Sequence, residues 1–240
     1  MQVVLLAAGL GSRLGALTER LPKALISVAD EPLLCHAVRF ARRLQPTEIV
    51  VVGGFGFGDV AAEVERRRLD VTLVENSEFM SGNLISLMAA RARVRGEFLL
   101  MNVDHIYRPA VASRVATAGP EITAFIDHDR TLGPDDMKVA RDSHGRIRRI
   151  AKALDEFDCG YVGMTWIPAG EIGRYWATAD LVLGTEGRAV HVERVLARLA
   201  ESESAPACLD VSGIGWLEVD FEGERDHAES VLRASPADWL

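Results

Sequence analysis

The sequence predicts a three-layer α/β/α fold around a mixed, mostly parallel sheet, and three observations lead to this prediction. Apolar, β-rich runs alternate with helical patterns through the first half of the 240 residues. These runs are nearly continuous in apolar residues, which is typical of parallel strands buried on both faces. The second half changes to short strand candidates, so we expect a small β-rich extension there.

The first half is expected to alternate strands with helices. The strands are predicted over residues 3–7, 48–52, 71–75 and 98–103, and the helices over residues 32–44, 59–68 and 84–92. Ligands of such sheets bind at the carboxyl ends of the strands. The segments that follow the strands are therefore the first place to look for a site.

Short strands dominate the prediction for the second half. They are expected over residues 122–127, 137–142, 147–151 and 162–167, with a D-S-H-G turn at residues 142–145 that suits a hairpin. Helical patterns return over residues 189–200 and 225–233, and an extended segment at 215–221 lies between them. No repeat, low-complexity segment or long linker interrupts the chain, so we expect one domain over residues 1–240.

Composition and charge exclude several classes of protein. The chain is 48% hydrophobic and carries a net charge of −8, which fits a globular protein without general attraction to nucleic acid or anionic lipid. Cys35, Cys159 and Cys208 are far apart and lack zinc-type spacing, which favours reduced thiols and a cytoplasmic location. The apolar start of the chain is too short to span a membrane, so we expect no membrane insertion.

A glycine-containing loop follows the first predicted strand. In the run Leu6–Leu14, L-A-A-G-L-G-S-R-L, Gly9 and Gly11 allow backbone N–H groups to approach an anion closely. Arg13 lies within the loop, and a proline-containing turn should bring Lys23 back toward it. Backbone donors and two fixed cations suit a triphosphate whose charge shifts during displacement at the α-phosphorus. The nucleotide-binding residues expected here are Leu6, Ala7, Ala8, Gly9, Gly11 and Ser12, with Arg13 and Lys23 as the catalytic cations.

Other kinds of glycine loop fit less well. The P-loop pattern G-x-x-x-x-G-K-[ST] is absent. A dinucleotide-binding loop is disfavoured because Leu14 takes the place of the third glycine and no acidic residue ends the second strand. A purely structural turn is the remaining alternative, and the presence of Lys23 argues against it.

Two apolar runs each end in an aspartate. The strand at 98–103 delivers Asp104, and the segment 216–219 delivers Asp220. A carboxylate in such a place needs a partner, and a hard divalent cation that bridges phosphates is a natural one. Asp104 and Asp220 are therefore the expected Mg²⁺ ligands. Each could instead cap a following helix, and the local sequence leaves that alternative open.

A polar loop leads into the third predicted helix. Ser81 or Asn83 could simply cap that helix. The alternative gives Asn83 and Ser86 to recognition of a base or a ribose. Local sequence does not decide between the two interpretations.

The loop motif extends to a longer signature that resembles a known family. The pattern L-A-A-G-x-G-x-R-L…P-K-x-L, met by Leu6–Leu14 and Pro22–Leu25, is similar to that of the sugar-nucleotide and phosphocholine-type nucleotidyltransferases. The resemblance implies a single Rossmann-like nucleotidyltransferase domain. Its nucleotide-binding half would be 1–105, and 106–240 would form an acceptor-binding half with a returning helix.

The middle of the chain resembles the cytidylyltransferase branch of that family. Asn76 and the G-N-x-x-S-L segment that begins at Gly82 carry part of this resemblance, and both residues are expected to bind nucleotide. The stretch D-M-K-V at 136–139 and the later Lys152 are similar to choline-phosphate and phosphonate cytidylyltransferases. The Asp-His pair at 104–105 is most similar to inositol-1-phosphate cytidylyltransferases, which form CDP-inositol.

The resemblance implies a reaction and its partners. CMP would pass from CTP to a small phosphorylated acceptor, with Mg²⁺ as cofactor and pyrophosphate as the second product. The implied acceptor-binding residues are Lys138, Lys152 and Tyr161, the last of which stands where many choline-phosphate enzymes have a glutamate. An acceptor phosphate is already an anionic nucleophile, so the reaction needs no Ser-His-Asp triad.

Two alternatives remain open at the level of sequence. One is a sugar-1-phosphate nucleotidyltransferase that uses UTP, GTP or dTTP, because a backbone carbonyl can select the base without leaving a sequence signal. The other is a non-catalytic nucleotide-sensing domain on the same fold, against which the presence of Lys23, Asp104 and Asp220 argues. Self-association as a homodimer is also left open.

Overall fold

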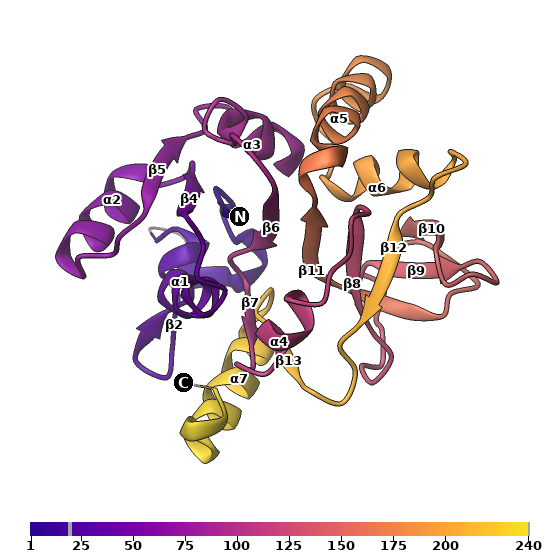
Figure 1. Ribbon diagram of the computed structural model, residues 1–240. Helices are drawn as coiled ribbons and strands as arrows, with labels where there is room; N and C mark the ends of the chain where they lie inside the picture. The colour runs from indigo at the N-terminus through magenta and orange to yellow at the C-terminus, as the bar shows by residue number, and fades with distance from the viewer. Residues whose placement is uncertain (19–20, 240) are drawn as a thin grey trace.

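A nine-stranded sheet runs through the centre of the molecule (Figure 1). The computed structural model describes residues 1–18 and 21–239. The main strand order is β10-β9-β11-β6-β1-β4-β5, and β8 joins β11 while β12 joins β8. These strands are β1 (Gln2–Ala7), β4 (Glu48–Gly53), β5 (Thr72–Glu75), β6 (Phe98–Asn102), β8 (Thr123–Asp127), β9 (Lys138–Arg141), β10 (Ile147–Ala151), β11 (Cys159–Ile167) and β12 (Ala207–Asp210).

The sheet changes character between its two halves. Strands β6, β1, β4 and β5 are all parallel, as the near-continuous apolar runs predicted. Strand β11 pairs antiparallel with β6, β8 and β9, and it therefore joins the parallel half to the β-rich extension. The predicted hairpin is also present: β9 and β10 are antiparallel, and Gly145 in their turn has a φ of 75°. The predicted mixed sheet is confirmed.

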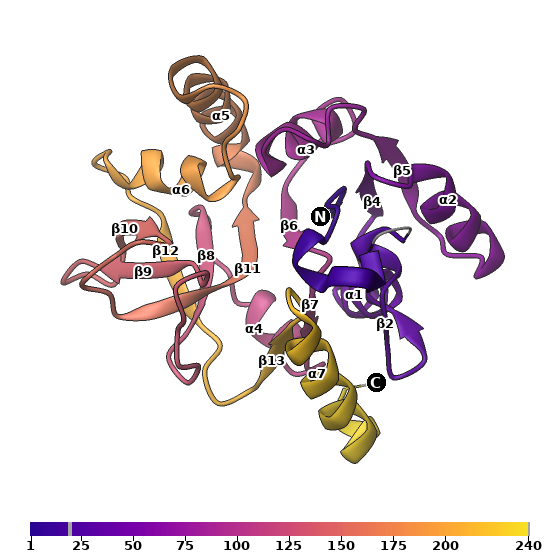
Figure 2. The same ribbon diagram turned by 180° about the vertical axis from the view of Figure 1, so that it is seen from behind.

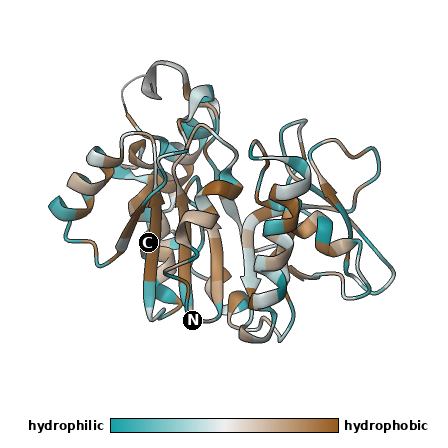
Figure 3. Cartoon of the chain, turned by 90° about the horizontal axis from the view of Figure 1, so that it is seen from above, coloured by the Kyte–Doolittle hydropathy of each residue, from teal (hydrophilic) through white to brown (hydrophobic). Residues whose placement is uncertain are grey.

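Helices cover both faces of the sheet, as the two opposite views show (Figures 1 and 2). Successive side chains of a strand point to opposite faces, so Val3 and Leu5 of β1 pack on one layer and Val4 and Leu6 on the other. The first layer contains α1 (Leu33–Arg43), α2 (Phe57–Arg66) and α4 (Val111–Val115). The second contains α3 (Asn83–Ala90), α5 (Ile172–Glu186) and α6 (Glu193–Ala200). Figure 3 shows the apolar strands between the helical layers, and the three-layer prediction is confirmed.

The last helix returns the chain to the first half. Helix α7 (Glu222–Ala234) packs Ala228 and Leu232 against Leu14 and Val28. Short elements lie around it: the ribbon of β7 (His105–Tyr107) and β13 (Trp216–Glu218), and the pair β2 (Ser27–Val28) and β3 (Glu31–Pro32). The 3₁₀ helices are Ser12–Thr18, Lys23–Leu25, Ala169–Glu171 and Pro236–Asp238.

The largest differences from the predicted elements lie in the second half. Helix α5 was not predicted, and neither were α4, β7 or β12. The helix predicted over 189–200 begins only at Glu193, because the preceding segment is bound to the start of α3. The amide of Gly82 donates to the carbonyl of Arg188, and a Cβ at Gly82 would lie 1.9 Å from the carbonyl oxygen of Val190.

Two further expectations concern the membrane and the cysteines. Over residues 1–18 and 21–239, no helix combines the length and the apolar character needed to cross a bilayer. Cys35, Cys159 and Cys208 carry free thiols. Burial raises the pKa of Cys159 to about 11 and that of Cys208 to about 12, so neither thiol is activated.

Candidate active site

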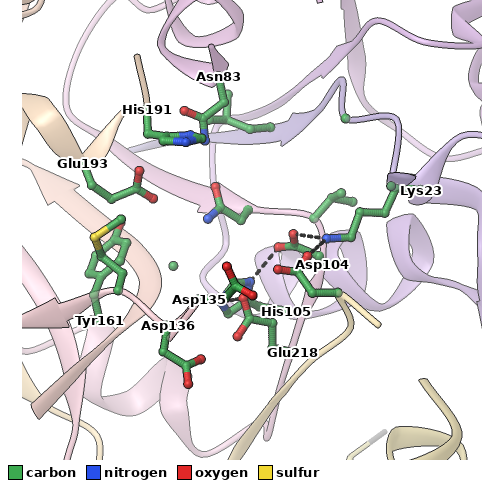
Figure 4. A pocket seen from close by; sticks show the side chains of 18 of the residues that line it. Lys23, Asn83, Asp104, His105, Asp135, Asp136, Tyr161, His191, Glu193 and Glu218 are labelled. Carbon is green, nitrogen blue, oxygen red and sulfur yellow. Dashed lines mark hydrogen bonds and ion pairs between the residues drawn. The ribbon is translucent and has the colours of Figure 1, made fainter. Parts of the chain in front are cut away.

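A cavity of about 270 Å³ lies at the carboxyl ends of β1 and β6 (Figure 4). Its wall is formed by the glycine loop after β1, the start of α3, the β6–β7 turn, the segment 132–137 and residues of β11 and β13. The structure brings most of the sequence-predicted residues to this wall: Leu6, Ala8, Gly9, Gly11, Ser12, Arg13, Lys23, Asn83, Ser86, Asp104, Lys152, Tyr161 and Asp220.

Lys23 lies at the centre of one end of the cavity, held between the two predicted metal ligands. Its ammonium donates to Asp104 Oδ2 at 2.5 Å and to Asp220 Oδ1. Arg13 Nη2 donates to the other oxygen of Asp220 at 2.6 Å. Segments 81 and 197 positions from Lys23 in the sequence therefore meet at one point.

The helix-capping alternative fails for both aspartates. Asp104 is followed by strand β7 instead of a helix, and Phe221 is the N-cap of α7. Since neither aspartate caps a helix, the position of each carboxylate is explained by its ion pair with Lys23. The metal-binding role of Asp104 and Asp220 stays a prediction.

Charge compensation fixes the protonation states of this cluster. Burial alone would raise the pKa of Asp104, but the positive charges of Lys23 and His105 outweigh it and hold that pKa well below its usual range. Burial likewise acts to lower the pKa of Lys23, and the two aspartates overcome it and raise that pKa. Both groups are therefore charged at neutral pH.

His105 orients Asp104 from behind. Its Nδ1 lies 2.7 Å from Asp104 Oδ1, and it must be the donor because an ionised carboxylate can only accept. The ring stacks between Trp216 and Tyr107, with centroid distances of 5.2 and 5.9 Å. Gly163 allows this packing, since a Cβ there would lie 2.8 Å from the imidazole. The sequence signalled His105 only through the family resemblance, and its place as the first residue of β7 was not foreseen.

The two carboxylates suit a divalent cation that arrives together with phosphates. Oxygens of Asp104 and Asp220 converge on one ammonium, so the same two carboxylates would be available to a metal ion once the ammonium moved away. Within the described part of the chain, no group of three or more His, Cys, Asp or Glu side chains is arranged to hold a metal. Mg²⁺ commonly uses one or two carboxylates plus substrate phosphates and water. The donor set thus fits a cation completed by a nucleotide.

The residues expected to contact base or ribose divide into two groups. Asn83 and Ser86 line the cavity, and Asn83 Oδ1 also accepts a hydrogen bond from the amide of Val192 at 2.7 Å. Neither Ser81 nor Asn83 caps α3, whose N-cap is Gly82 without a side-chain hydrogen bond. Asn76 lies behind the wall, where its side chain donates to Ser86 Oγ at 3.0 Å. Ala7 and Gly82 are also absent from the lining.

The predicted acceptor-binding residues also separate. Lys152 and Tyr161 line the cavity, and the hydroxyl of Tyr161 bonds Thr165 Oγ1 at 2.8 Å. Lys138 does not line it. Its buried ammonium donates to the carbonyls of Gly133, Lys152 and Asp136 at 2.6, 2.8 and 3.3 Å. Lys138 therefore supports the cavity wall from behind, which differs from the predicted contact with acceptor.

Comparison with known proteins gives a family match and curated relatives. The model of the MobA-like NTP transferase domain matches residues 3–159. The chain is 27% identical to a "Bifunctional IPC transferase and DIPP synthase" of Aquifex aeolicus over 95% of this chain and 51% of that protein. It is 30% identical to a "CMP-5'-(3-aminopropyl)phosphonate synthase" of Streptomyces rubellomurinus over 98% of this chain and 39% of that protein. The chain thus spans about half or less of the length of these relatives.

Solved structures share the fold over nearly the whole chain. The inositol-1-phosphate CTP transferase from T. maritima superposes with a TM-score of 0.81 at 17% identity, covering 96% of each chain. The CTP:phosphocholine cytidylyltransferase from Streptococcus pneumoniae superposes with a TM-score of 0.76 at 19% identity, covering 96% of this chain and 98% of that one. At such identities the likeness establishes the fold alone.

Proposed function

Because the chain belongs to the MobA-like NTP transferase family, we propose that it transfers CMP from CTP to a small phosphorylated acceptor and releases pyrophosphate. One observation carries the proposal: Arg13, Lys23, Asp104 and Asp220 converge beside the glycine loop, at the wall of one cavity. This arrangement places hydrogen-bond donors for phosphate oxygens, fixed positive charges and two carboxylates for a divalent cation in one site.

The residues of the loop and the ion-pair cluster have separate tasks in this mechanism. Backbone amides of residues 9–12 bind phosphate oxygens, and Arg13 and Lys23 neutralise the charge that develops at the α-phosphate. Asp104 and Asp220 would hold Mg²⁺, which when bound supplies Lewis-acid and template chemistry. Lys23 must then exchange its two carboxylate partners for phosphate oxygens when nucleotide enters.

The bond changes require no proton transfer. An oxygen of the acceptor phosphate or phosphonate attacks the α-phosphorus, and a new P–O–P bridge forms. The bond from the α-phosphorus to the bridging oxygen breaks, and its electron pair leaves with pyrophosphate. The chain contributes alignment and charge neutralisation, which is consistent with the charged side chains that line the cavity.

The choice of CTP and of the acceptor class is supported by the relatives. Their names specify an IPC transferase, a CMP-phosphonate synthase and an inositol-1-phosphate CTP transferase. We therefore propose inositol 1-phosphate or a related phospho-alcohol or phosphonate as acceptor. Lys152 and Tyr161, which both line the cavity, are the proposed acceptor contacts.

A mass-spectrometric assay tests the proposed function. The protein is incubated with Mg²⁺, each of the four nucleoside triphosphates and a panel of inositol 1-phosphate, phosphocholine, 2-aminoethylphosphonate and glucose 1-phosphate. We expect a CMP-linked product from CTP alone, and its loss when EDTA is added. A product from UTP, GTP or dTTP in preference to CTP would contradict the base assignment. Nucleotide binding without any product would contradict catalysis and favour the sensing domain.

A further inference from the structure

A second charged group lies at the end of the cavity away from Lys23. Glu193 begins helix α6, is 8% exposed, and lines the cavity with Tyr161, His191 and Lys152. Figure 4 shows its carboxylate directed into the cavity, on the side of Tyr161 and apart from the Lys23–Asp104 pair. Sequence reasoning gave Glu193 no role.

Glu193 differs from the other carboxylates of the cavity in its partners. The lining contains the carboxylates of Asp104, Asp135, Asp136, Glu193, Glu218 and Asp220. Lys23 or Arg13 pairs with Asp104, Asp220 and Asp135, and Arg130 pairs with Asp136 and Glu218. Within residues 1–18 and 21–239, Glu193 alone among these six has no ion pair.

The environment of Glu193 compensates its charge only in part. Burial raises the pKa of its carboxyl, against a hydrogen bond to its own backbone and the more distant charges of His191 and Lys152. An enclosed carboxylate without a cation is unfavourable, because desolvation is not offset by a charge of opposite sign. Such a group is stabilised most by a ligand that brings a positive charge.

We propose that the acceptor carries a protonated amine as well as its phosphate or phosphonate, and that the Glu193 carboxylate binds this amine. The inference rests on the proposed function and narrows its acceptor class to aminoalkyl phosphates and phosphonates. Lys152 lines the same cavity and interacts electrostatically with Glu193, and its ammonium would contact the phosphate or phosphonate of the acceptor. A zwitterion fits this end because it presents one charge of each sign to Lys152 and Glu193.

A neutral polyol fits this end less well. Hydroxyl groups can donate to a carboxylate, but they bring no positive charge to offset its desolvation inside the protein. An ammonium both donates hydrogen bonds and neutralises the charge, and charge-assisted hydrogen bonds are roughly twice as strong as neutral ones. The structure therefore favours an amine over a hydroxyl as the partner of Glu193.

The test compares two acceptors that differ only in the charged group. 2-Aminoethylphosphonate and propylphosphonate have the same length, with an ammonium in one and a methyl group in the other. With saturating CTP and Mg²⁺, we expect kcat/KM to favour the amine by on the order of 100-fold. Glu193→Gln should remove most of that preference and leave the KM for CTP unchanged. Glu201→Gln, at an exposed ion pair at the end of the same helix, is the matched control and should keep the preference.

Several results would overturn the proposal. One is an equal kcat/KM for the two phosphonates. A second is a higher kcat/KM for myo-inositol 1-phosphate than for 2-aminoethylphosphonate, with the inositol activity lost in Glu193→Gln; this result would assign Glu193 to hydroxyl groups. Another is a higher KM for CTP in Glu193→Gln with every acceptor, which would assign Glu193 to the nucleotide.

Calorimetry keeps this inference separate from the proposed function. Binding of 2-aminoethylphosphonate is measured in the presence of Mg²⁺ and the non-transferable analogue α,β-methylene-CTP. Binding that weakens on the order of 100-fold in Glu193→Gln supports the amine site even when no turnover is found. Binding that is the same in both proteins, or stronger for propylphosphonate, contradicts it.

Discussion

The two ends of the cavity differ in whether their buried charged side chains have ion-pair partners. At one end, which we propose binds nucleotide and call the nucleotide end, Lys23 lies between Asp104 and Asp220, so the fold satisfies its own charges before any ligand arrives. At the other, the proposed acceptor end, the buried Glu193 has no ion pair within the described residues. Lys23 must exchange its carboxylate partners when a ligand binds, whereas Glu193 only gains a partner. We infer that nucleotide and metal enter by displacement and that the acceptor completes an incomplete site.

The largest effect is expected from removing the central cation of the nucleotide end. Lys23→Ala deletes the charge that would stabilise the α-phosphate during displacement, so we expect kcat to fall by about 10²–10³-fold. Steady-state kinetics with the best acceptor measure this, and thermal unfolding checks that the fold is kept. Arg198→Ala, at an exposed ion pair, is the control and should leave the rate unchanged. A near wild-type rate for Lys23→Ala would remove Lys23 from the mechanism.

The same substitution tests whether Lys23 competes with the metal. Without the ammonium, the oxygens of Asp104 and Asp220 that contact Lys23 lose their cation, while His105 and Arg13 still contact the other oxygen of each carboxylate. A divalent cation should therefore bind more readily in the absence of nucleotide. We expect Mn²⁺ affinity, measured by electron paramagnetic resonance, to rise by about tenfold or more in Lys23→Ala, since one decade is only about 1.4 kcal/mol. Unchanged affinity would mean that the carboxylates are not the metal ligands, and the comparison between the two ends would lose its basis.

Smaller effects are expected from replacing the two lysines near the acceptor end, one on the acceptor KM and the other on stability. Lys152→Ala should raise the acceptor KM by about tenfold, the cost of one lost charged contact, with little change in thermal stability. Lys138→Ala should instead lower the stability by about 1–3 kcal/mol, because three carbonyls lose their buried donor. Acceptor titrations and chemical denaturation distinguish the two. The reverse pattern would show that Lys138, and not Lys152, faces the acceptor.

The residues at the Lys23 end of the cavity could be predicted from the sequence because each segment that forms it carries its own local signal. The glycine loop follows a strongly apolar strand, and Asp104 lies in the turn after another strand of the same parallel sheet. Parallel strands place their carboxyl ends at one edge, so the approach of Asp104 to the glycine loop followed from topology. The ion pair between Lys23 and Asp104 was not predicted. Asp220 lies between β13 and α7, where the chain returns to the first half of the molecule. The apolar run before Asp220 indicated this return.

The acceptor end could not be predicted because long-range contacts set it. The position of Glu193 depends on the hydrogen bond from the amide of Val192 to Asn83, which joins residues 109 positions apart. Lys138 carries the family pattern but is turned onto backbone carbonyls by the fold around it. Helix α5 was missed for a different reason: Gly173 and Gly184 weaken its local propensity, and its packing on the sheet compensates.

Phosphorus NMR of the wild-type protein with CTP, Mg²⁺ and acceptor tests the central claim most directly. We expect pyrophosphate and a P–O–P-bridged CMP product to appear in equal amounts as CTP disappears. Formation of CDP or inorganic phosphate instead would place the reaction at the γ-phosphate, and the proposed attack at the α-phosphorus would be wrong.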